Sequence, residues 1–600
     1  MSNLTPLPIT PPPGVVLTES ERVLEGRWIA SRNIRFVNGK PQKTGGNVRA
    51  VTTPASGTPR AAHAWRDNFQ NNFIAVGTYR KLYVYDTNFA QNDITPFIAA
   101  GTLGTNPFTT TNASNVVTVN QAVHGRNIGD TVIFLGATAV GGITPNGTFL
   151  VASVVDSSNY TFQFTSNATS GATGGGAAVT YSYEVPVGTE LGIYGLGYGA
   201  GGFGLSTYGT TRDPSVASST LFIEPRVWSL DHFGQLLIAA YNGGTIYQFD
   251  PTASQPWGRT TVISTDPGLP ANVRFAFVTN ERFIFALLTG MQVAWPTQGT
   301  LTDWTPTATN TANVRTLTEG TKLVAGRVLS DFVSLVWSDA AVFHFQYTGS
   351  TYVYNSSMIA KDCGLIAPGA AVTAGGIAYW MGQNTFWTYN GSVQPMQNVE
   401  DIRKYVFDAV DINLGYQATA IYSPQHNEVW FFYSIAGEVN PTLGVIYSIA
   451  QGCWAPLDYG RTSGTHFTQG ATHPYMGAAD GYLYEHEVGY DDNGQILPLS
   501  LELAAYAMQD GGQHMDVQFI VPDFFQQVGN ITMTINTRDR LNDTVLEDSE
   551  TEIIGVSDTG TIDMRVSGRY IGMVLQQSSL GSYMRLGKPI AWVQESGNRT

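Results

Sequence analysis

Histidines are among the residues of this chain that could bind a metal ion, and they can transfer a proton near neutral pH. The nine histidines are scattered, and none belongs to an HExxH zinc motif. His466 and His473 are near one another in sequence, and Glu485 and Glu487 flank a third histidine, His486. Neither spacing matches a zinc-ligand pattern, and histidines on sheet edges are more often hydrogen-bonded structural residues. The sequence therefore predicts no metal site and no cofactor.

Paired carboxylates could hydrolyse a glycosidic bond. Aspartates occur on several predicted turns: Asp231, Asp331, Asp339, Asp362, Asp401, Asp408, Asp411 and Asp480. An aspartate at a turn usually accepts hydrogen bonds from nearby backbone amides. The sequence contains neither a recurrent Ser-x-Asp-x-Gly-x-x-Trp box nor a GxSxG nucleophile motif. These observations predict a protein that is not an enzyme and has no catalytic residues.

The composition indicates a chain of short strands joined by many turns. Charged residues make up 13% of the 600 residues, whereas an ordinary soluble protein has about 25%. The chain has 65 Gly and 29 Pro, which favour turns, and 12% aromatic residues, which favour strands. The net charge of −15 argues against a basic surface that grips nucleic acid.

The ends of the chain and its cysteines bear on where the protein is made. The N-terminus lacks the basic and apolar regions of a signal peptide, and no window approaches about 18 uninterrupted apolar residues. We therefore expect a cytosolic product without a membrane span. Cys363 and Cys453 are expected to be buried apolar residues, although a single bridge between them stays open. A cytosolic protein with the composition of an extracellular β-protein suits a component of a viral particle.

A pattern of strand, turn, strand, turn and strand recurs along the chain. It is found at residues 62–86, 227–251, 275–295, 328–347, 371–391, 422–454 and 466–487. Spacing of roughly 40–50 residues with several short strands per unit is typical of β-propeller blades, and we estimate about six blades. The tryptophans of these units, Trp65, Trp228, Trp337, Trp380 and Trp430, are expected to pack between blades.

The fold class predicted is all-β, with a propeller and additional β-domains. The boundaries are 1–59 for an N-terminal arm and first strands, 60–105 and 186–494 for the propeller, 106–185 for an inserted small β-barrel or sandwich, and 495–600 for a C-terminal β-sandwich. A single helix is predicted at Asn398–Val410, where apolar residues recur with helical spacing. Its apolar face is expected to pack on the propeller, with a subunit contact as the alternative.

A segment rich in glycine and tyrosine, Glu190–Pro214, interrupts the pattern of units. Its irregular Gly spacing excludes collagen, and it has no GxxxxGK[ST] phosphate-binding loop. A long loop of this kind usually packs on a partner or changes shape.

Several stretches together resemble one family of phage proteins. They are NIRFVNGKPQKTGG (33–46), YGLGYGAGGFGLSTYGT (194–210), RVWSLDHFGQLLIAAYNGGTIYQFDP (226–251) and SGRYIGMVLQQSSLGSYMRLGKPIAWVQESG (567–597). The segment 124–162 is similar to small β-domains of phage tail proteins. The family is that of the tail nozzle, or packaged-DNA stabilisation, proteins of short-tailed bacteriophages (podoviruses).

The resemblance implies a structural virion protein, made in the host cytoplasm and located in the viral tail. It implies a homo-hexamer below the tail adaptor protein that closes the DNA channel, stabilises the packaged genome and opens for DNA ejection. Double-stranded DNA would pass through the lumen without sequence recognition, and an acidic chain suits sliding of the duplex. We further expect the inserted domain to contact the adaptor or the tail fibre or tailspike proteins.

The glycine-rich segment is the candidate gate of that channel. Glycine permits refolding, and aromatic side chains can meet across a symmetry axis. The candidate gate residues are Tyr194, Tyr198, Phe203 and Tyr208.

An alternative from another class remains open. A tail propeller with exposed tryptophan and tyrosine side chains could bind or cleave carbohydrate on the host surface.

Overall fold

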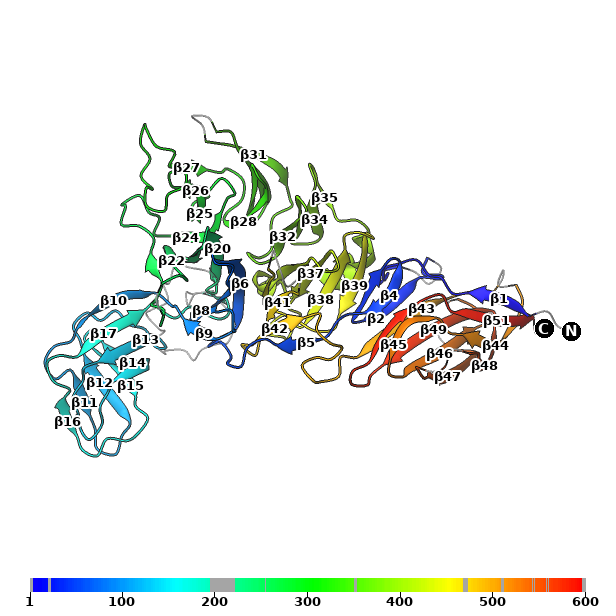
Figure 1. The fold of residues 1–600 in the computed structure, drawn as a ribbon, viewed down its shortest axis with the longest axis horizontal. Coiled ribbons are helices and arrows are strands. Elements are labelled where there is room, and N and C mark those ends of the chain that lie inside the picture. Colours follow the sequence, from blue (N-terminus) through cyan, green and yellow to red (C-terminus); the bar gives the residue numbers. More distant parts are fainter. Residues whose placement is uncertain are drawn as a thin grey trace, which may run out of the picture.

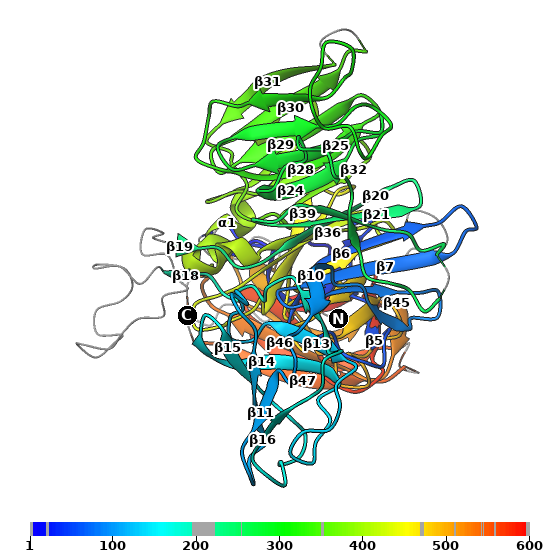
Figure 2. The same cartoon turned by 90° about the vertical axis from the view of Figure 1, so that its left-hand side faces the viewer.

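The computed structural model describes residues 4–19, 23–194, 222–253, 255–349, 353–467, 473–508, 512–541, 543, 545–556, 558 and 560–595. Regular structure in these residues is almost entirely β. Figure 1 shows three parts, with an inserted β-domain and a β-sandwich at opposite ends and a propeller between them. Figure 2 shows the same molecule from the end that carries the inserted domain, with the blades of strands β24–β31 projecting to one side.

The central part is a propeller whose blades are four-stranded antiparallel sheets. In the described part of the chain, seven such sheets form the ring, and each innermost strand adjoins the innermost strand of the next sheet. The blades, each from its inner to its outer strand, are β6 (Pro59–Arg66), β7 (Asn72–Thr78), β8 (Leu82–Tyr85), β9 (Gln91–Asp93); β20 (Trp228–Phe233), β21 (Leu236–Tyr241), β22 (Ile246–Phe249), β23 (Thr261–Val262); β24 (Val273–Val278), β25 (Ile284–Leu288), β26 (Gln292–Trp295), β27 (Asn313–Thr316); β28 (Leu323–Ser330), β29 (Val333–Ser338), β30 (Ala341–Tyr347), β31 (Tyr354–Lys361); β32 (Ala371–Ala374), β33 (Ile377–Met381), β34 (Phe386–Tyr389), β35 (Val393–Pro395); β36 (Thr419–Ser423), β37 (Glu428–Tyr433), β38 (Leu443–Ser448), β39 (Cys453–Leu457); and β40 (Ser463–Thr465), β41 (Tyr475–Gly477), β42 (Leu483–His486), β5 (Asn47–Arg49).

The propeller is confirmed, but the estimate of about six blades is one too low. The last unit of the sequence, near residues 466–487, supplies only three strands, β40–β42. Its fourth strand, β5, comes from the beginning of the chain. The repeat spacing along the sequence therefore cannot reveal the fourth strand of this blade. The expected packing of the tryptophans between blades is confirmed, because each is buried in a core cluster with residues of a neighbouring blade. Trp65 and Trp228 share one cluster, Trp337 and Trp380 share another, and Trp430 lies with Met476 of the seventh blade.

Strand β5 closes the ring by joining the two ends of the propeller sequence. It pairs antiparallel with β42, and Val48 lies opposite Glu485. Innermost strand β40 of this blade adjoins β6 of the first blade. The outer edge of the last blade is therefore held by a strand that lies more than four hundred residues away in sequence.

We expect Val48→Pro to destabilise the protein, because proline cannot donate a hydrogen bond to the β42 ladder. The loss should be about 1–2 kcal/mol in the free energy of unfolding, measured by urea denaturation. Val48→Thr is the matched control, since threonine keeps the backbone donor and the β-branched shape. Equal denaturation midpoints for Val48→Pro and the wild type would contradict the closing role of β5.

The inserted domain lies between the first two blades in sequence and has its own core. Its strands form one antiparallel sheet in the order β10 (Phe97–Thr102), β17 (Thr180–Glu184), β13 (Thr131–Leu135), β14 (Gly147–Asp156), β15 (Asn159–Gln163), β12 (Val116–Asn120), β11 (Phe108–Thr110) and β16 (Ala172–Gly174). The sheet curves around a buried aromatic cluster that includes Phe108, Phe134 and Phe162. Because this core is separate from the blade cores, the domain interrupts the ring sequence without breaking a blade.

The β-sandwich combines both ends of the chain. One sheet has the order β1 (Thr5–Pro8), β51 (Ile590–Glu595), β44 (Met515–Val521) and β48 (Ile562–Gly568). The second has the order β2 (Trp28–Arg32), β43 (Leu499–Ala507), β49 (Tyr570–Gln577), β46 (Ile531–Arg538) and β47 (Asp548–Ile554). A third sheet contains β3 (Ile34–Val37), β4 (Lys40–Lys43), β50 (Tyr583–Leu586) and β45 (Phe524–Val528). The N-terminal strands thus pair with C-terminal strands before the chain enters the propeller.

The single α-helix of the described residues, α1 (Glu400–Phe407), links the fifth and sixth blades and is followed by the 3₁₀ turn Ile412–Gln417. Its side chains Ile402 and Val406 are buried in the main propeller core. The interpretation that the apolar face packs on the propeller is therefore confirmed, although the helix is shorter than Asn398–Val410. No helix in the described part of the chain is long and apolar enough to cross a membrane.

The joint between sandwich and propeller contains a buried ion cluster. Arg35, on β3, donates two hydrogen bonds of 2.8 and 2.6 Å to the carboxylate of Glu487. It also lies 3.6 Å from a carboxylate oxygen of Glu428, on the sixth blade. Their side chains are 0%, 4% and 1% exposed, respectively. Burial would raise the pKa of Glu487, but Arg35 and a hydrogen bond with His426 lower it to about 2.

We expect Glu487→Gln to lower the free energy of unfolding at pH 7 by about 3 kcal/mol, because it removes one partner of a buried ion pair. The folded pKa of Glu487 lies below its ordinary value of 4.5, so the wild-type contribution is present above that pH. It is lost as the pH falls toward 2. Denaturation at a series of pH values should therefore show the difference between wild type and variant shrinking below pH 4.5.

Glu438→Gln is the control for this experiment, because Glu438 is exposed on the turn between β37 and β38. If Glu487→Gln and Glu438→Gln lower the free energy of unfolding equally, the ion cluster does not stabilise the joint between sandwich and propeller.

Candidate functional site

The innermost strands of all seven blades in the described ring surround a central channel, and this channel is the candidate functional site. Its cavity has a volume of about 740 Å³. The residues that line it on the seven strands include Ala62, Leu230, Phe277, Val328, Thr373, Ile421 and Thr465. Most of this wall is apolar or neutral, so its few charged groups stand out.

The described lining of the channel contains three arginines, Arg60, Arg282 and Arg327, and one carboxylate, that of Asp231. Arg327 donates hydrogen bonds to the backbone carbonyls of Gly326, Pro368 and Ala371. Burial lowers the pKa of Arg327 to about 10. The arginine therefore remains charged at neutral pH, and main-chain oxygens hold its guanidinium.

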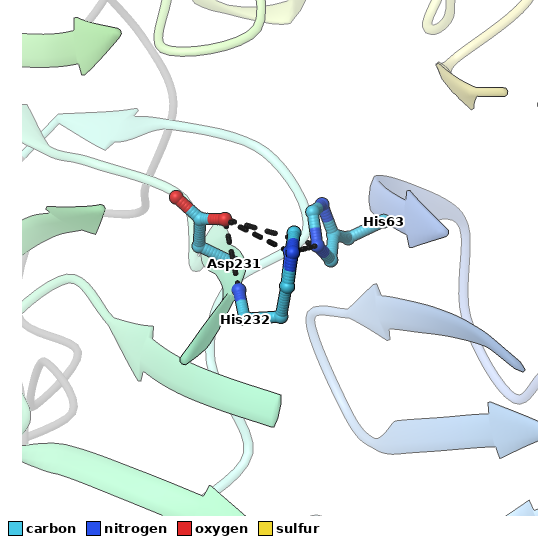
Figure 3. A group of neighbouring side chains, drawn as sticks. All are labelled: His63, Asp231 and His232. Carbon is cyan, nitrogen blue, oxygen red and sulfur yellow. Dashed lines mark hydrogen bonds and ion pairs between the residues drawn. The ribbon is translucent and has the colours of Figure 1, made fainter. Parts of the chain in front are cut away.

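One group of side chains in the channel wall could perform chemistry: His63, Asp231 and His232 (Figure 3). His63 lies on β6, and the other two lie on β20 of the next blade. Nε2 of His63 and Nδ1 of His232 share a hydrogen bond of 3.0 Å. Oδ1 of Asp231 lies 3.8 Å from Nε2 of His63 and 3.5 Å from Nδ1 of His232.

Burial and neighbouring charges set the protonation of this group. Burial lowers the pKa of His63 to about 4, so its imidazole is neutral at pH 7. The hydrogen bond with Asp231 raises the pKa of His232. Burial would raise the pKa of Asp231, but His232 and His63 outweigh it and hold the pKa below its usual value. The group thus consists of two imidazoles and one ionised carboxylate, whose possible ligand atoms lie close together.

The backbone fixes the position of the carboxylate. Oδ1 of Asp231 accepts a hydrogen bond of 2.8 Å from the backbone N–H of His232. Its Oδ2 accepts one of 2.8 Å from the N–H of Val278, on the third blade.

Of the aspartates assigned to turns, Asp231 lies on a strand and Asp401 in helix α1, so the turn assignment is wrong for these two.

Close packing at the same seam holds the first two blades together. Gly77, on β7, faces Trp228, on β20, and a Cβ added at Gly77 would lie only 2.6 Å from the Cβ of Trp228. The indole nitrogen of Trp228 donates a hydrogen bond of 2.9 Å to the carbonyl of Thr78. Position 77 therefore requires glycine, because a side chain there would prevent the close approach of β7 to Trp228.

We expect Gly77→Ala to lower the free energy of unfolding by about 1–3 kcal/mol, because the extra methyl group forces the two blades apart. Thermal unfolding measures the change. Gly258→Ala is the control, since an added Cβ there meets no atom within 4 Å. An unchanged melting temperature for Gly77→Ala would mean that the seam tolerates expansion.

The gate residues predicted from the sequence lie mainly outside the described residues. Tyr198, Phe203 and Tyr208 lie outside the described residues, and the structure does not bear on them. Tyr194 is the last residue of β18 (Ile193–Tyr194), which pairs with β19 (Phe222–Ile223). Just before β18, the N–H of Gly192 donates a hydrogen bond of 2.8 Å to the hydroxyl of Tyr416.

The sequence did not indicate the group of His63, Asp231 and His232. His63 and Asp231 are far apart along the chain, because the inserted domain separates their blades. The only available signal was the repeat itself, since both residues lie on the first strand of their units.

The expected state of the cysteines is confirmed, because Cys363 and Cys453 are buried and free.

Comparisons with known proteins yielded similarities in fold only. No protein-family model and no curated protein sequence matches the chain. The computationally designed Ika8 protein is similar in structure, with 10% identity, 74% of this chain and 99% of that chain covered, and a TM-score of 0.33. The WD40 β-propeller domain of Doa1 has 9% identity, coverages of 65% and 97%, and a TM-score of 0.28. BamB from Moraxella catarrhalis has 10% identity, coverages of 45% and 84%, and a TM-score of 0.25. Because these identities and TM-scores are low, the propeller assignment rests on the strand pairing within this chain.

Proposed function

We propose that this chain is the subunit of a hexameric tail nozzle in a short-tailed bacteriophage. In this role it is a structural protein, not an enzyme. It extends the tail tube below the adaptor, retains the packaged genome and opens for DNA ejection into the host. The proposal rests on the sequence resemblance and on one structural observation, the continuous connection between sandwich and propeller.

That connection makes the chain suitable for bearing load. Strands β1–β4 belong to the sheets of the sandwich, and the next strand, β5, completes the last blade. The buried ion cluster of Arg35 lies at the same joint. A subunit that retains DNA under pressure needs parts that do not slip against one another, and interleaved backbone pairing supplies that property.

The two ends of the molecule offer separate surfaces for neighbours in a tail. Large apolar side chains are exposed on the inserted domain, among them Val123, Ile128 and Val155. Others are exposed in the sandwich, among them Phe525 and Ile553. Exposed apolar side chains of this size suit contacts with other subunits. We assign the inserted domain to the adaptor or to the fibre or tailspike proteins.

The acidic balance of the chain suits the passage of DNA through the lumen of the hexamer. A net charge of −15 repels phosphates on average, so the chain does not grip the duplex, which can slide without sequence recognition. In this proposal the glycine-rich segment with Tyr194, Tyr198, Phe203 and Tyr208 supplies the gate.

The test is the assembly state of the purified full-length chain, alone and with the adaptor protein. Negative-stain electron microscopy and analytical ultracentrifugation should reveal six-fold rings when the adaptor is present. The same preparation is incubated with polysaccharide from the host surface. A chain that forms no ring with the adaptor but binds or cleaves the polysaccharide would contradict the nozzle and favour a carbohydrate-directed propeller.

A further inference from the structure

We propose that His63, Asp231 and His232 form a binding site for a divalent transition-metal ion, with Zn²⁺ as the ion that fits best, in the wall of the central channel. Two imidazole nitrogens and one carboxylate oxygen are a ligand set that suits Zn²⁺ and its neighbours in the first transition row. The site is independent of the proposed tail function, because it concerns the seam between two blades of one chain.

The spacing of the three ligand atoms matches a four-coordinate ion. Metal–ligand bonds of about 2.0–2.2 Å place the atoms of a tetrahedral site about 3.3–3.6 Å apart. The distances are 3.0 Å between the two imidazole nitrogens, 3.5 Å from Asp231 to His232 and 3.8 Å from Asp231 to His63. Shifts of a few tenths of an ångström therefore convert the hydrogen-bonded group into a coordinated one.

The carboxylate is held in place before any ion binds. The N–H groups of His232 and Val278 each donate a hydrogen bond to Asp231. Ligating carboxylates are typically hydrogen-bonded in this manner by an outer layer of donors. The ring of His63 stacks on that of Trp65, with centroids 6.2 Å apart, which restrains the imidazole.

The fourth coordination position has room for water. The three side chains lie in the wall of the cavity of about 740 Å³, and a water molecule occupies only about 30 Å³. Arg327 also lines the cavity and affects His63 electrostatically. Its guanidinium donates to backbone carbonyls, however, so the carboxylate of Asp231 remains available to a cation.

An ion at this position would connect the two blades where the chain leaves the ring. His63 is on the first blade and Asp231 and His232 are on the second, and residues 94–227 run between those blades. Coordination replaces the hydrogen bond between the imidazoles with one metal bond to Nε2 of His63 and one to Nδ1 of His232. Each imidazole then keeps a proton on its other nitrogen. The ion would strengthen the seam at which no short loop joins neighbouring blades.

The test uses the full-length protein after dialysis against a chelator. Calorimetric titration with Zn²⁺ should show one ion bound per chain, and Co²⁺ should produce the visible absorption of a four-coordinate ion. Zn²⁺ should also raise the melting temperature of the metal-free protein. Each of His63→Ala, Asp231→Asn and His232→Ala should weaken Zn²⁺ binding at least about tenfold and abolish the rise in melting temperature.

Two control variants make the assignment specific. His466→Ala removes another histidine that lines the channel. His514→Ala removes the histidine of a second group, in which His514 lies near Asp539 and Glu547 of the sandwich. Both controls should bind one Zn²⁺ per chain as the wild type does.

Three results would overturn the proposal. One is that the metal-free wild type takes up less than one Zn²⁺ per chain. The second is that binding persists in the double variant His63→Ala/His232→Ala, and the third is that binding is lost in His514→Ala. Circular dichroism of each metal-free variant separates loss of a ligand from loss of the fold. If His63→Ala does not fold, the conservative His63→Gln takes its place.

Discussion

The buried contact of Arg35 with Glu428 and Glu487 is the interaction on which the arrangement of the domains depends. A buried guanidinium is costly to desolvate, and only close carboxylates with good hydrogen-bond geometry offset that cost. The carboxylates come from the propeller and the arginine from a strand of the sandwich sheets. The charges are therefore satisfied only when the two parts lie together, and this selects one docking position.

This joint also sets the path of the chain into the propeller. After β3 and β4 have paired in the sandwich, the chain passes directly to β5, which completes the seventh blade. Closure of the ring and docking of the sandwich are consequences of one N-terminal segment. The tail-nozzle proposal rests on the sequence resemblance, and this property supports it, because the domains of a subunit that retains DNA must not move against one another. The central channel, in turn, exists only because the ring is closed.

The sequence predicted those features that depend on local patterns and missed those that depend on distant pairing. Alternating apolar residues and turn signals revealed the blades from 227 to 454, and helical spacing revealed α1. The unit at residues 466–487 was recognised, although the spacing of the units gave an estimate of about six blades. The fourth strand of that last blade, β5, was missed because it lies at the other end of the chain. The group in the channel was missed for the same reason, since His63 meets Asp231 only when two blades separated by a domain become neighbours.

The central claim, that this chain forms the nozzle of a viral tail, is tested most directly by electron cryo-microscopy that seeks the chain in an intact phage particle. The account predicts six copies around the tail axis below the adaptor, with the sandwich and the propeller of each copy in one rigid arrangement. Density that places the chain in a peripheral fibre, or in a ring without six-fold symmetry, would contradict the account.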